Sequence, residues 1–353
     1  MAVAPKIAIV TGAPGWLGSR LVECLLQGLP DVPMLSDAEP RVVRVAREPG
    51  NNDASLKRFG EQVQVVDCDI TDGASVERLF AGTWEPVVFH VAGVVHPTKG
   101  RKQFYDVNVN GTANMLEGAI KARTKRFVYV SSNSPIGCNP TRTALFDEDS
   151  PYNPYMHYGQ SKKLAEDLVN EKSLTGNLET VIIRPPWFYG PGQPPRQALF
   201  FSMIKNGKVP IVGDGNNLRS MAYIDNICQG LMLAERTEAA RGQTYWIADR
   251  KPYSMNEIVD TIERLLETEF NMQVAHKRMR LPDVASEVAL LVDAALQSVG
   301  LYHQKFHVLS EMNKSIACSV TKAERELGYD PKVSLEEGMR RSIKWALANG
   351  QTI

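Results

Sequence analysis

The first half of the chain alternates short apolar runs with stretches in which hydrophobic residues recur every three or four positions. The apolar runs, at residues 6–11, 63–66, 87–91 and 126–130, have the length of buried strands, and residues 41–47 alternate between polar and apolar as a strand does. The stretches between them have the spacing of helices that bury one face. Strands that alternate with helices predict an α/β fold, with a Rossmann-like, doubly wound parallel sheet.

A proline-rich passage follows a sixth apolar run, which ends at Arg184. Its prolines, at positions 185, 186, 191, 194 and 195, stiffen the chain. We expect residues 1–184 to form a dinucleotide-binding domain, to which residues 221–249 return. Residues 185–220 and 250–353 are expected to form a smaller, mostly C-terminal substrate-binding lobe.

The first apolar run ends in the glycine-rich turn Gly12-Ala13-Pro14-Gly15-Trp16-Leu17-Gly18, and a helical pattern follows. Glycine permits a tight turn and a close approach of the backbone to a ligand. The N–H groups at the start of the following helix favour a phosphate. This order predicts that the turn binds the pyrophosphate of a dinucleotide, although glycines with this spacing also occur in ordinary turns.

Polar or small residues follow three further strands. They are Asp69 and Ile70, Ala92 and Gly93, and Ser132 and Asn133. Ligands of doubly wound sheets lie beyond the carboxyl ends of the strands, where these residues are expected. Asn108 lies on an otherwise apolar helical face, and we expect either a satisfied core asparagine or a functional one.

Tyr158 and Lys162 lie four residues apart at the start of a predicted helix and therefore share one face. A fixed cation favours the phenolate, so we expect Lys162 to bring the pKa of Tyr158 toward the working range. The pair predicts proton transfer, although the same spacing occurs by chance on surface helices. Ser132 strengthens the prediction, because a β-loop-α connection brings its hydroxyl to the same edge of the sheet.

The end of the second strand bears on the choice of cofactor. An NAD site normally has an acidic residue there for the ribose 2′-hydroxyl, whereas this strand ends in Arg47. An arginine can pair with a 2′-phosphate, so the sequence favours NADP, with NAD as the alternative. A solvated surface arginine, followed directly by Glu48, is the competing interpretation.

Composition narrows the class of protein. The 40 basic and 40 acidic side chains balance without a basic run, so nucleic acid is not an expected partner. Five scattered cysteines without metal-ligand spacing predict a reduced, cytoplasmic protein and no metal site. We expect no signal peptide, and no apolar stretch reaches the roughly 18 residues of a membrane span.

Seven short motifs follow one another along the chain. They are Thr11-Gly12-x-x-Gly15-x-x-Gly18, Asp69-Ile70-Thr71-Asp72, His90-Val91-Ala92-Gly93, Asn108-Val109-Asn110-Gly111-Thr112, Val130-Ser131-Ser132-x-x-x-Gly137, Tyr158-x-x-x-Lys162 and Arg184-Pro185-x-x-x-Tyr189-Gly190. In this order they resemble the extended short-chain dehydrogenase/reductase superfamily, over nearly the whole chain. We therefore expect the fold and chemistry of that superfamily.

The resemblance implies roles for individual residues. Tyr158 is expected to be the general acid/base, Lys162 to tune it and hold the nicotinamide ribose, and Ser132 to orient the reacting carbonyl. Asp69 is expected at the adenine. Cofactor contacts are expected from Gly12, Gly15, Trp16, Leu17, Gly18, Arg47, Asp69, Ile70, Ala92, Gly93, Asn108, Tyr158, Lys162 and Pro185.

The C-terminal half resembles two branches of the superfamily. Arg219 lies where nucleotide-sugar enzymes place an arginine for the diphosphate. The broad apolar face at residues 281–309 and the strand that ends in Arg47 instead resemble the branch of 3-beta-hydroxysteroid dehydrogenases, sterol-4-carboxylate dehydrogenases and dihydroflavonol reductases. The 281–309 segment is expected to line a hydrophobic pocket, to touch a membrane peripherally, or to pack on the core of its own lobe. Sugar 4,6-dehydratases are disfavoured, because they carry an acidic pair where this chain has Asn133-Ser134.

We therefore expect an NAD(P)-dependent oxidoreductase that interconverts a secondary alcohol and a ketone. Its small-molecule substrate is expected to be largely hydrophobic, such as a sterol, a fatty or an aromatic hydroxy compound, and to be bound by Asn133, Trp187, Tyr189 and Arg219. A nucleotide-sugar 4-epimerase is the alternative function, and a non-catalytic cofactor-binding regulator is the third. A homodimer is the expected assembly.

Overall fold

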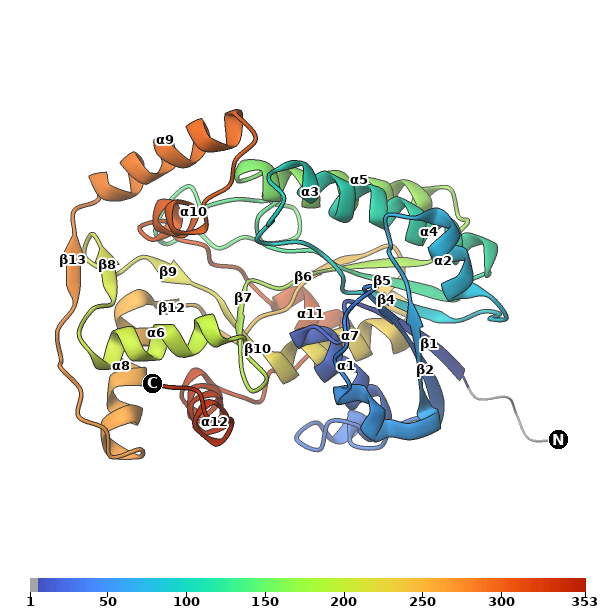
Figure 1. Ribbon diagram of the computed structural model, residues 1–353, viewed down its shortest axis with the longest axis horizontal. Coiled ribbons are helices and arrows are strands. Elements are labelled where there is room, and N and C mark those ends of the chain that lie inside the picture. Colours follow the sequence, from blue (N-terminus) through green and yellow to red (C-terminus); the bar gives the residue numbers. More distant parts are fainter. Residues whose placement is uncertain (1–5) are drawn as a thin grey trace.

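A seven-stranded parallel sheet with the strand order β11-β6-β5-β4-β1-β2-β3 forms one half of the molecule (Figure 1). The computed structural model describes residues 6–353. The strands are β1 (Lys6–Thr11), β2 (Arg41–Arg47), β3 (Val63–Asp67), β4 (Val87–His90), β5 (Arg126–Val130), β6 (Thr180–Arg184) and β11 (Thr244–Trp246). The strand order reverses between β1 and β4, so the predicted doubly wound sheet is confirmed.

Helices cover both faces of this sheet, because successive strand residues point to opposite sides. Val10 packs in the cluster that contains residues of α1 and α7, whereas Ile9 packs in the cluster that contains residues of α2, α4 and α5. The first face carries α1 (Trp16–Gln27), α7 (Ile224–Arg236) and α11 (Thr321–Leu327), and the second carries α2 (Gly73–Phe80), α4 (Thr112–Lys121) and α5 (Met156–Leu174). Both faces are thereby shielded, as a parallel sheet requires.

The single helix expected over residues 102–122 is interrupted by a π-helical segment. The observed elements are α3 (Lys102–Tyr105), the π-helical η3 (Asp106–Gly111) and α4. Asn108 lies inside the π-helical segment and is fully hydrogen-bonded to two other parts of the chain, as described below. Such segments often occur near functional sites.

The other half of the molecule is built largely from the C-terminal part of the chain. Its elements are β7 (Trp187–Tyr189), α6 (Pro195–Lys205), β8 (Pro210–Val212), β9 (Leu218–Arg219), β10 (Met221–Tyr223), β12 (Tyr253–Ser254), α8 (Met255–Thr268), β13 (Met279–Leu281), α9 (Val284–Ser298), α10 (Gln304–Glu311) and α12 (Leu335–Ala348). Short 3₁₀ helices lie at Pro33–Leu35, Ser55–Gln62 and Glu238–Ala240. β11 lies in the central sheet beside β6. α11, which we had expected in the substrate-binding lobe, instead packs on α7 and β11.

The helices α9 and α10 lie together at one corner of the molecule (Figure 1). Strand β13, which pairs with β8, leads the chain into α9. The expectation that the apolar face of residues 281–309 packs on the core of the lobe is wrong. Its exposed side chains include Val284 (60% exposed), Val288 (54%) and Leu291 (71%).

Candidate active site

The glycine turn between β1 and α1 forms a backbone cradle without room for side chains. Gly12 has a φ of +77°, and a Cβ atom there would lie 2.8 Å from the backbone nitrogen of Ala92. A Cβ atom on Gly18 would lie 2.4 Å from the carbonyl oxygen of Gly12. Gly15 caps α1 without a side-chain hydrogen bond. The first N–H groups of α1 therefore have no side-chain cap, and this cradle fits the pyrophosphate of a dinucleotide.

Trp16 and Leu17 follow this turn and pack in different surroundings. Trp16 donates from Nε1 to the carbonyl oxygen of Pro191 at 2.7 Å, which joins α1 to the passage into the second lobe. Leu17 is 5% exposed and lies in the hydrophobic cluster of the α1 face. Its side chain is therefore part of the core, which leaves only its backbone for the predicted cofactor contact.

A buried chain of hydrogen bonds fixes the strand ends beside the cradle. The hydroxyl of Thr11 accepts from the backbone N–H groups of Val91 and Ala92, at 3.1 and 3.0 Å. His90 lies 2.8 Å from the Thr11 hydroxyl through Nδ1 and 3.0 Å from the Thr112 hydroxyl through Nε2. Burial lowers the pKa of His90 to about 3, so this ring is neutral at physiological pH. Thr11 and Thr112 were not predicted as site residues from the sequence, although both lie in the motifs quoted above.

Tyr158 lies in the first turn of α5, and Ser132 follows the end of β5. Burial raises the pKa of Tyr158 to about 12; a hydrogen bond with Ser132 opposes this rise, and the charge of Glu311 adds to it. The Tyr158 ring centroid lies 5.8 Å from that of Phe104. Ser132 and Tyr158 are thus brought together at the carboxyl edge of the sheet.

Lys162 lies beside this pair but is turned toward the backbone. Its Nζ donates to the carbonyl oxygen of Val130 at 2.7 Å and lies 4.5 Å from the centroid of the Tyr129 ring. Burial lowers the pKa of Lys162 to about 7, against the opposing influence of Glu166. The Tyr158 pKa is raised, with burial as the largest cause, and its expected lowering by Lys162 stays a prediction.

Glu166 anchors the catalytic helix to the sheet and was missed in the sequence. It is fully buried and accepts hydrogen bonds from Ser131 (2.5 Å), Tyr152 (2.6 Å) and the Arg184 guanidinium (2.6 and 3.0 Å). These bonds join α5 to the ends of β5 and β6. The sequence signal that could have identified Glu166 is its position four residues beyond Lys162, on the same face of α5.

Asn108 has both of its side-chain polar atoms occupied by the chain. Oδ1 accepts from the N–H of Val94 at 2.8 Å, and Nδ2 donates to the carbonyl oxygen of Val94 and to the Ser161 hydroxyl, each at 3.0 Å. The residue is 1% exposed. The side chain is therefore satisfied within the chain, as the core alternative expected, and its contact with a cofactor stays a prediction. Asn108 holds the loop after β4 against α5.

The residues expected around the adenosine half lie at the ends of β2 and β3. Arg47 donates from Nε to Asp67 at 2.7 Å, so its charge is partly neutralised. Asp69 is exposed and accepts from the backbone and the hydroxyl of Thr71, at 2.9 and 2.8 Å. Ile70 is buried, with 8% of its surface exposed. Asp67 is a residue that sequence reasoning missed, and it stands directly opposite Arg47 in the β2–β3 register.

The predicted substrate-binding residues have different surroundings. Asn133 and Trp187 are partly exposed, and the Trp187 ring packs 5.6 Å from that of Phe200. Tyr189 is 2% exposed and its hydroxyl donates to Asp249 at 2.7 Å, so this side chain belongs to the core, contrary to the prediction. Aromatic residues after a strand are commonly buried in this way.

Arg219 and Pro185 are the remaining predicted site residues. Arg219 donates from Nη2 to the carbonyl oxygen of Glu311 at 2.8 Å, at the end of α10, and its buried Nε has no hydrogen-bond partner among residues 6–353. Pro185 is buried directly after β6, whereas after β4 Ala92 is partly exposed and Gly93 is exposed. Within residues 6–353, the Arg219 guanidinium thus makes a side-chain hydrogen bond only through Nη2.

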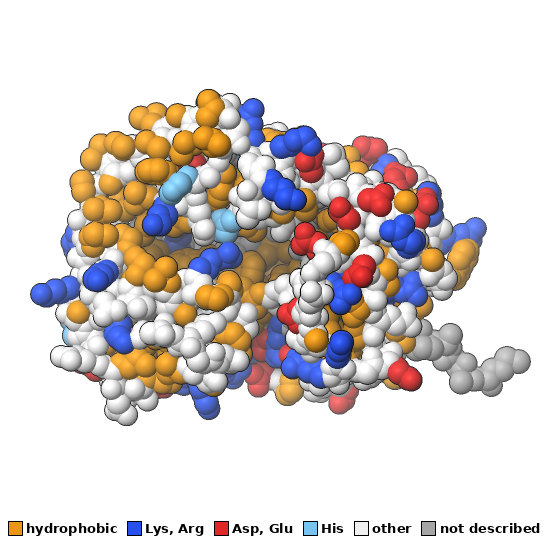
Figure 2. All heavy atoms as spheres, viewed as in Figure 1, with side chains coloured by type: hydrophobic (Ala, Val, Ile, Leu, Met, Phe, Trp, Pro, Cys, Tyr) orange, Lys and Arg blue, Asp and Glu red, His pale blue; other side chains and the backbone are white. Residues whose placement is uncertain are grey.

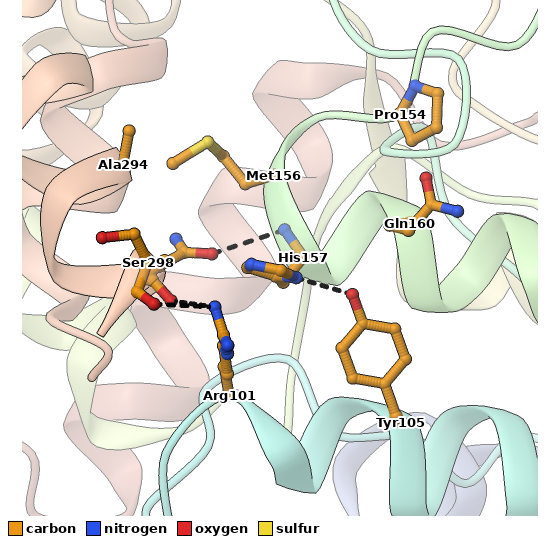
Figure 3. A pocket seen from close by; sticks show the side chains of 9 residues that line it. Arg101, Tyr105, Pro154, Met156, His157, Gln160, Ala294 and Ser298 are labelled. Atoms are coloured by element: carbon orange, nitrogen blue, oxygen red, sulfur yellow. Dashed lines mark hydrogen bonds between the residues drawn. The ribbon is translucent and has the colours of Figure 1, made fainter. Parts of the chain in front are cut away.

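The two lobes enclose a hollow with a largely hydrophobic floor, and both basic and acidic side chains lie near its rim (Figure 2). A separate pocket of about 500 Å³ lies between α3, the start of α5 and the end of α9. Figure 3 shows Tyr105 pointing at His157 in this pocket, with their Oη and Nδ1 atoms 2.6 Å apart. Ser132, Tyr158 and Lys162 are not among its lining residues. Within residues 6–353, no three His, Cys, Asp or Glu side chains are grouped to hold a metal ion.

Comparisons with known proteins agree with this architecture. The sequence profile of the 3-beta hydroxysteroid dehydrogenase/isomerase family matches residues 9–281. The uncharacterized protein y4nL of Sinorhizobium fredii is 46% identical, over 98% of this chain and 96% of its own length. The 3beta-hydroxysteroid-dehydrogenase/decarboxylase isoform 1 of Arabidopsis thaliana is 30% identical, over 95% of this chain and 78% of its own. The solved structure of DesIV (dTDP-glucose 4,6-dehydratase) from Streptomyces venezuelae, with NAD and TYD bound, is similar with a TM-score of 0.73 at 26% identity, over 98% of both chains.

Fold and comparisons together define an enzyme of the extended short-chain dehydrogenase/reductase superfamily. Within that superfamily, the chain belongs to the 3-beta hydroxysteroid dehydrogenase/isomerase family. The recognition of the superfamily and the prediction of an enzyme are both confirmed.

Proposed function

We propose that this enzyme interconverts a secondary alcohol and a ketone on a largely hydrophobic, sterol-like substrate. The observation that carries the proposal is the placement of Ser132 beside Tyr158, near enough to influence the pKa of the phenol, with Lys162 one helical turn away. This pair lies at the carboxyl edge of a doubly wound sheet, where ligands of such folds bind. The 30% identical Arabidopsis relative, named a 3beta-hydroxysteroid-dehydrogenase/decarboxylase, supports the substrate class.

The pKa of Tyr158 supports a role as proton donor in the reducing direction. Because this pKa is raised to about 12, the phenol is protonated at neutral pH and can protonate the oxygen of a ketone. Ser132 would donate a hydrogen bond to the same oxygen. A nicotinamide cofactor supplies or accepts the hydride in this family of reactions. In the oxidising direction, Tyr158 must first lose its proton, so we expect oxidation to become faster as pH rises.

Three parts of the chain would hold a nicotinamide dinucleotide in this proposal. The glycine turn and the start of α1 would hold the pyrophosphate, and Asp69 and Ile70 would lie at the adenine. Arg47 remains the group that would meet a 2′-phosphate, although its ion pair with Asp67 reduces its free charge. NADP therefore stays our predicted preference and NAD the alternative, and DesIV has NAD bound.

A nucleotide-sugar 4-epimerase is the second candidate, and Arg219 favours it. The guanidinium of this arginine has the chemistry to bind a diphosphate. Arg219 is nevertheless held against the end of α10 by its hydrogen bond to the carbonyl oxygen of Glu311. The sugar function therefore ranks second. The homodimer and the cytoplasmic location also stay predictions.

A substrate screen separates the two functions. The purified enzyme is incubated with hydroxysterols, fatty and aromatic hydroxy compounds and nucleotide sugars, with NAD and NADP in separate reactions. We expect net formation of reduced nicotinamide with one or more of the hydrophobic alcohols. Conversion of a nucleotide sugar alone, without net reduced nicotinamide, would overturn the proposal in favour of an epimerase.

A further inference from the structure

The helix α5, which carries Tyr158, begins without a cap of its own. Its N-cap residue, Tyr155, makes no side-chain hydrogen bond to the first N–H groups, which a helix cannot satisfy internally. The Tyr155 hydroxyl instead lies 2.6 Å from the Ser310 hydroxyl on α10. Met156, the first residue of the helix, has a φ of +54°, a left-handed conformation that non-glycine residues rarely adopt. The turn that contains Tyr158 therefore depends on contacts from outside the helix.

Gln297, in the last turn of α9, supplies a cap from the other lobe. Its Oε1 accepts from the backbone N–H of His157 at 3.3 Å, in the first turn of α5 and one residue before Tyr158 (Figure 3). Gln297 is 2% exposed, so water has little access to this bond. A capping residue normally directly precedes its own helix. This one comes from a position 140 residues further along the chain.

The buried face of α9 is polar, so the position of this helix depends on hydrogen bonds. Its buried residues are Ser286, Ala289, Asp293 and Gln297. Ser286 donates to the carbonyl oxygen of Leu309 on α10 at 2.9 Å. Apolar residues such as Leu291 face outward, and neither α9 nor any other helix of residues 6–353 is long and apolar enough to cross a membrane. Rotation of α9 would leave its buried polar groups unpaired, so Gln297 stays directed at the start of α5.

A buried carboxylate fixes which end of the Gln297 amide faces α5. Asp293, one turn earlier on α9, accepts from Gln297 Nε2 and from His307 Nδ1, each at 2.9 Å. Burial lowers the pKa of His307, but the hydrogen bond with Asp293 and the charges of Glu311 and Asp293 outweigh burial and raise it. Because an ionised carboxylate only accepts hydrogen bonds, the NH₂ group of the amide must face Asp293. The carbonyl oxygen is then left to face the N–H of His157.

His157 is also held through its ring. Its Nδ1 lies 2.6 Å from the Tyr105 hydroxyl at the end of α3, so α3 holds the ring while α9 holds the backbone of the same residue (Figure 3). Arg101, directly before α3, donates to two carbonyl oxygens in the last turn of α9, at 2.6 and 3.2 Å. The residue that precedes Tyr158 is thus fixed at two points, and the two elements that fix it are bound to each other.

We propose that Gln297 is a positioning residue for the proton transfer by Tyr158, an inference that rests on the proposed function. Gln297 would act through the backbone of His157, by holding the first turn of α5 where the Tyr158 hydroxyl lies beside Ser132. A small displacement of a reacting group lowers the rate strongly. Loss of this cap should therefore lower kcat more than it changes KM. The substrate-binding lobe would thereby complete the catalytic helix of the cofactor-binding domain.

Turnover and amide hydrogen exchange of Gln297→Met test this role. Methionine is similar in length to glutamine, but its sulfur is only a weak acceptor for the N–H of His157. With the best substrate of the screen, whichever class it belongs to, we expect kcat to fall by about ten-fold or more, while substrate KM and cofactor Kd stay within about two-fold of wild type. Amide exchange of the peptide that contains His157 should become about ten-fold faster, a readout that needs no substrate.

A reversed pair tests the direction of the hydrogen bonds. In Asp293→Asn/Gln297→Glu, the new amide NH₂ would donate to the new carboxylate and to the unprotonated Nδ1 of His307. That carboxylate would still accept from the N–H of His157, so we expect kcat and amide exchange within about three-fold of wild type. Gln160→Met is the matched control, because Gln160 lines the same pocket as Gln297 and makes no hydrogen bond with the residues drawn in Figure 3, so its kcat should be kept.

Each of three results would overturn the proposal. In the first, kcat of Gln297→Met is no lower than that of Gln160→Met. In the second, Gln297→Met loses cofactor affinity and substrate affinity as much as kcat, which would identify Gln297 as a residue of general stability. In the third, the reversed pair recovers neither kcat nor the exchange of wild type. Loss of kcat in Gln297→Met with a nucleotide sugar as the only substrate would contradict the proposed function and support the positioning role.

Discussion

Tyr158 and Lys162 lie one helical turn apart, and burial shifts the pKa values of both in the direction that keeps each group uncharged. The pKa of the Tyr158 phenol is raised to about 12, and the pKa of the Lys162 ammonium is lowered to about 7. Burial disfavours a charge of either sign, so these shifts have one physical cause. At neutral pH, Tyr158 is therefore a protonated acid, and it lies beside a lysine that titrates near this pH.

The lowered pKa of Lys162 predicts how the stability of the folded chain depends on pH. The pKa of Lys162 is about 7 in the folded chain, against an ordinary value of 10.5. Between these values the unfolded state binds more protons, so the free energy of unfolding rises with pH, by up to about 1.4 kcal/mol per pH unit. We expect Lys162→Met to remove this rise in urea unfolding of the cofactor-free protein between those two pH values.

Lys163→Met is the matched control for this experiment. Lys163 is the next residue on α5, and it is partly exposed and paired with Asp167. Its substitution should leave the pH dependence of the wild-type protein intact. Equal slopes in the wild-type and Lys162→Met proteins would show that Lys162 does not titrate in this window.

The position of Arg47 at the end of β2 predicts a preference between NADP and NAD. If its guanidinium pairs with a 2′-phosphate, Arg47→Ala should weaken NADP binding by about ten-fold or more and leave NAD binding nearly unchanged. Asp67→Asn should act in the opposite direction, because it frees Arg47 from its ion pair. Both affinities can be measured by calorimetry with the two oxidised cofactors. Equal losses for NAD and NADP in Arg47→Ala would identify it as a structural surface residue.

At the scale of elements, the glycine turn positions the cofactor end of the cleft. Because a Cβ atom on Gly18 would lie 2.4 Å from a carbonyl oxygen, Gly18→Ala must displace α1 from the turn. We expect cofactor affinity to fall by about ten-fold or more, together with a loss of roughly 1–3 kcal/mol in stability. Gly73→Ala at the start of α2 is the control, since its nearest neighbour would be 3.9 Å away. Similar affinities of both variants for the cofactor would contradict this account of the turn.

Hydrophobic patterning predicted the strands of the central sheet well, but not the orientation of α9. Strands such as β1 (Lys6–Thr11) and β5 (Arg126–Val130) match their apolar runs, because a strand of a parallel sheet is buried on both faces. For residues 281–309, hydrophobic patterning predicted the wrong orientation, because it assumes that the apolar face of a helix is buried. Hydrophobic patterning also did not predict the π-helical break at Asp106–Gly111, because this break depends on hydrogen bonds of Asn108 to residues distant in sequence.

At the scale of the whole molecule, the candidate site follows from topology more than from local sequence. Ser132 and Tyr158 were predicted to meet because parallel strands present their carboxyl ends at one edge, and the structure brings them together. The anchoring role of Glu166 was not predicted, because it depends on Arg184 and Tyr152 arriving from other elements. The burial of Tyr189 was missed for the same reason. Tertiary partners of a side chain are not encoded in its neighbours along the chain.

The most direct test of the central claim is the turnover of Tyr158→Phe with the best hydrophobic alcohol or ketone of the screen. Removal of one hydroxyl should lower kcat by ~10² to 10⁴, while the cofactor Kd stays within about two-fold of the wild-type value. Tyr245→Phe is the matched control, because its hydroxyl donates to Glu326 at 2.9 Å, away from Ser132 and Lys162, and its turnover should be kept. Wild-type kcat in Tyr158→Phe would contradict the assignment of Tyr158 as the group that moves the proton.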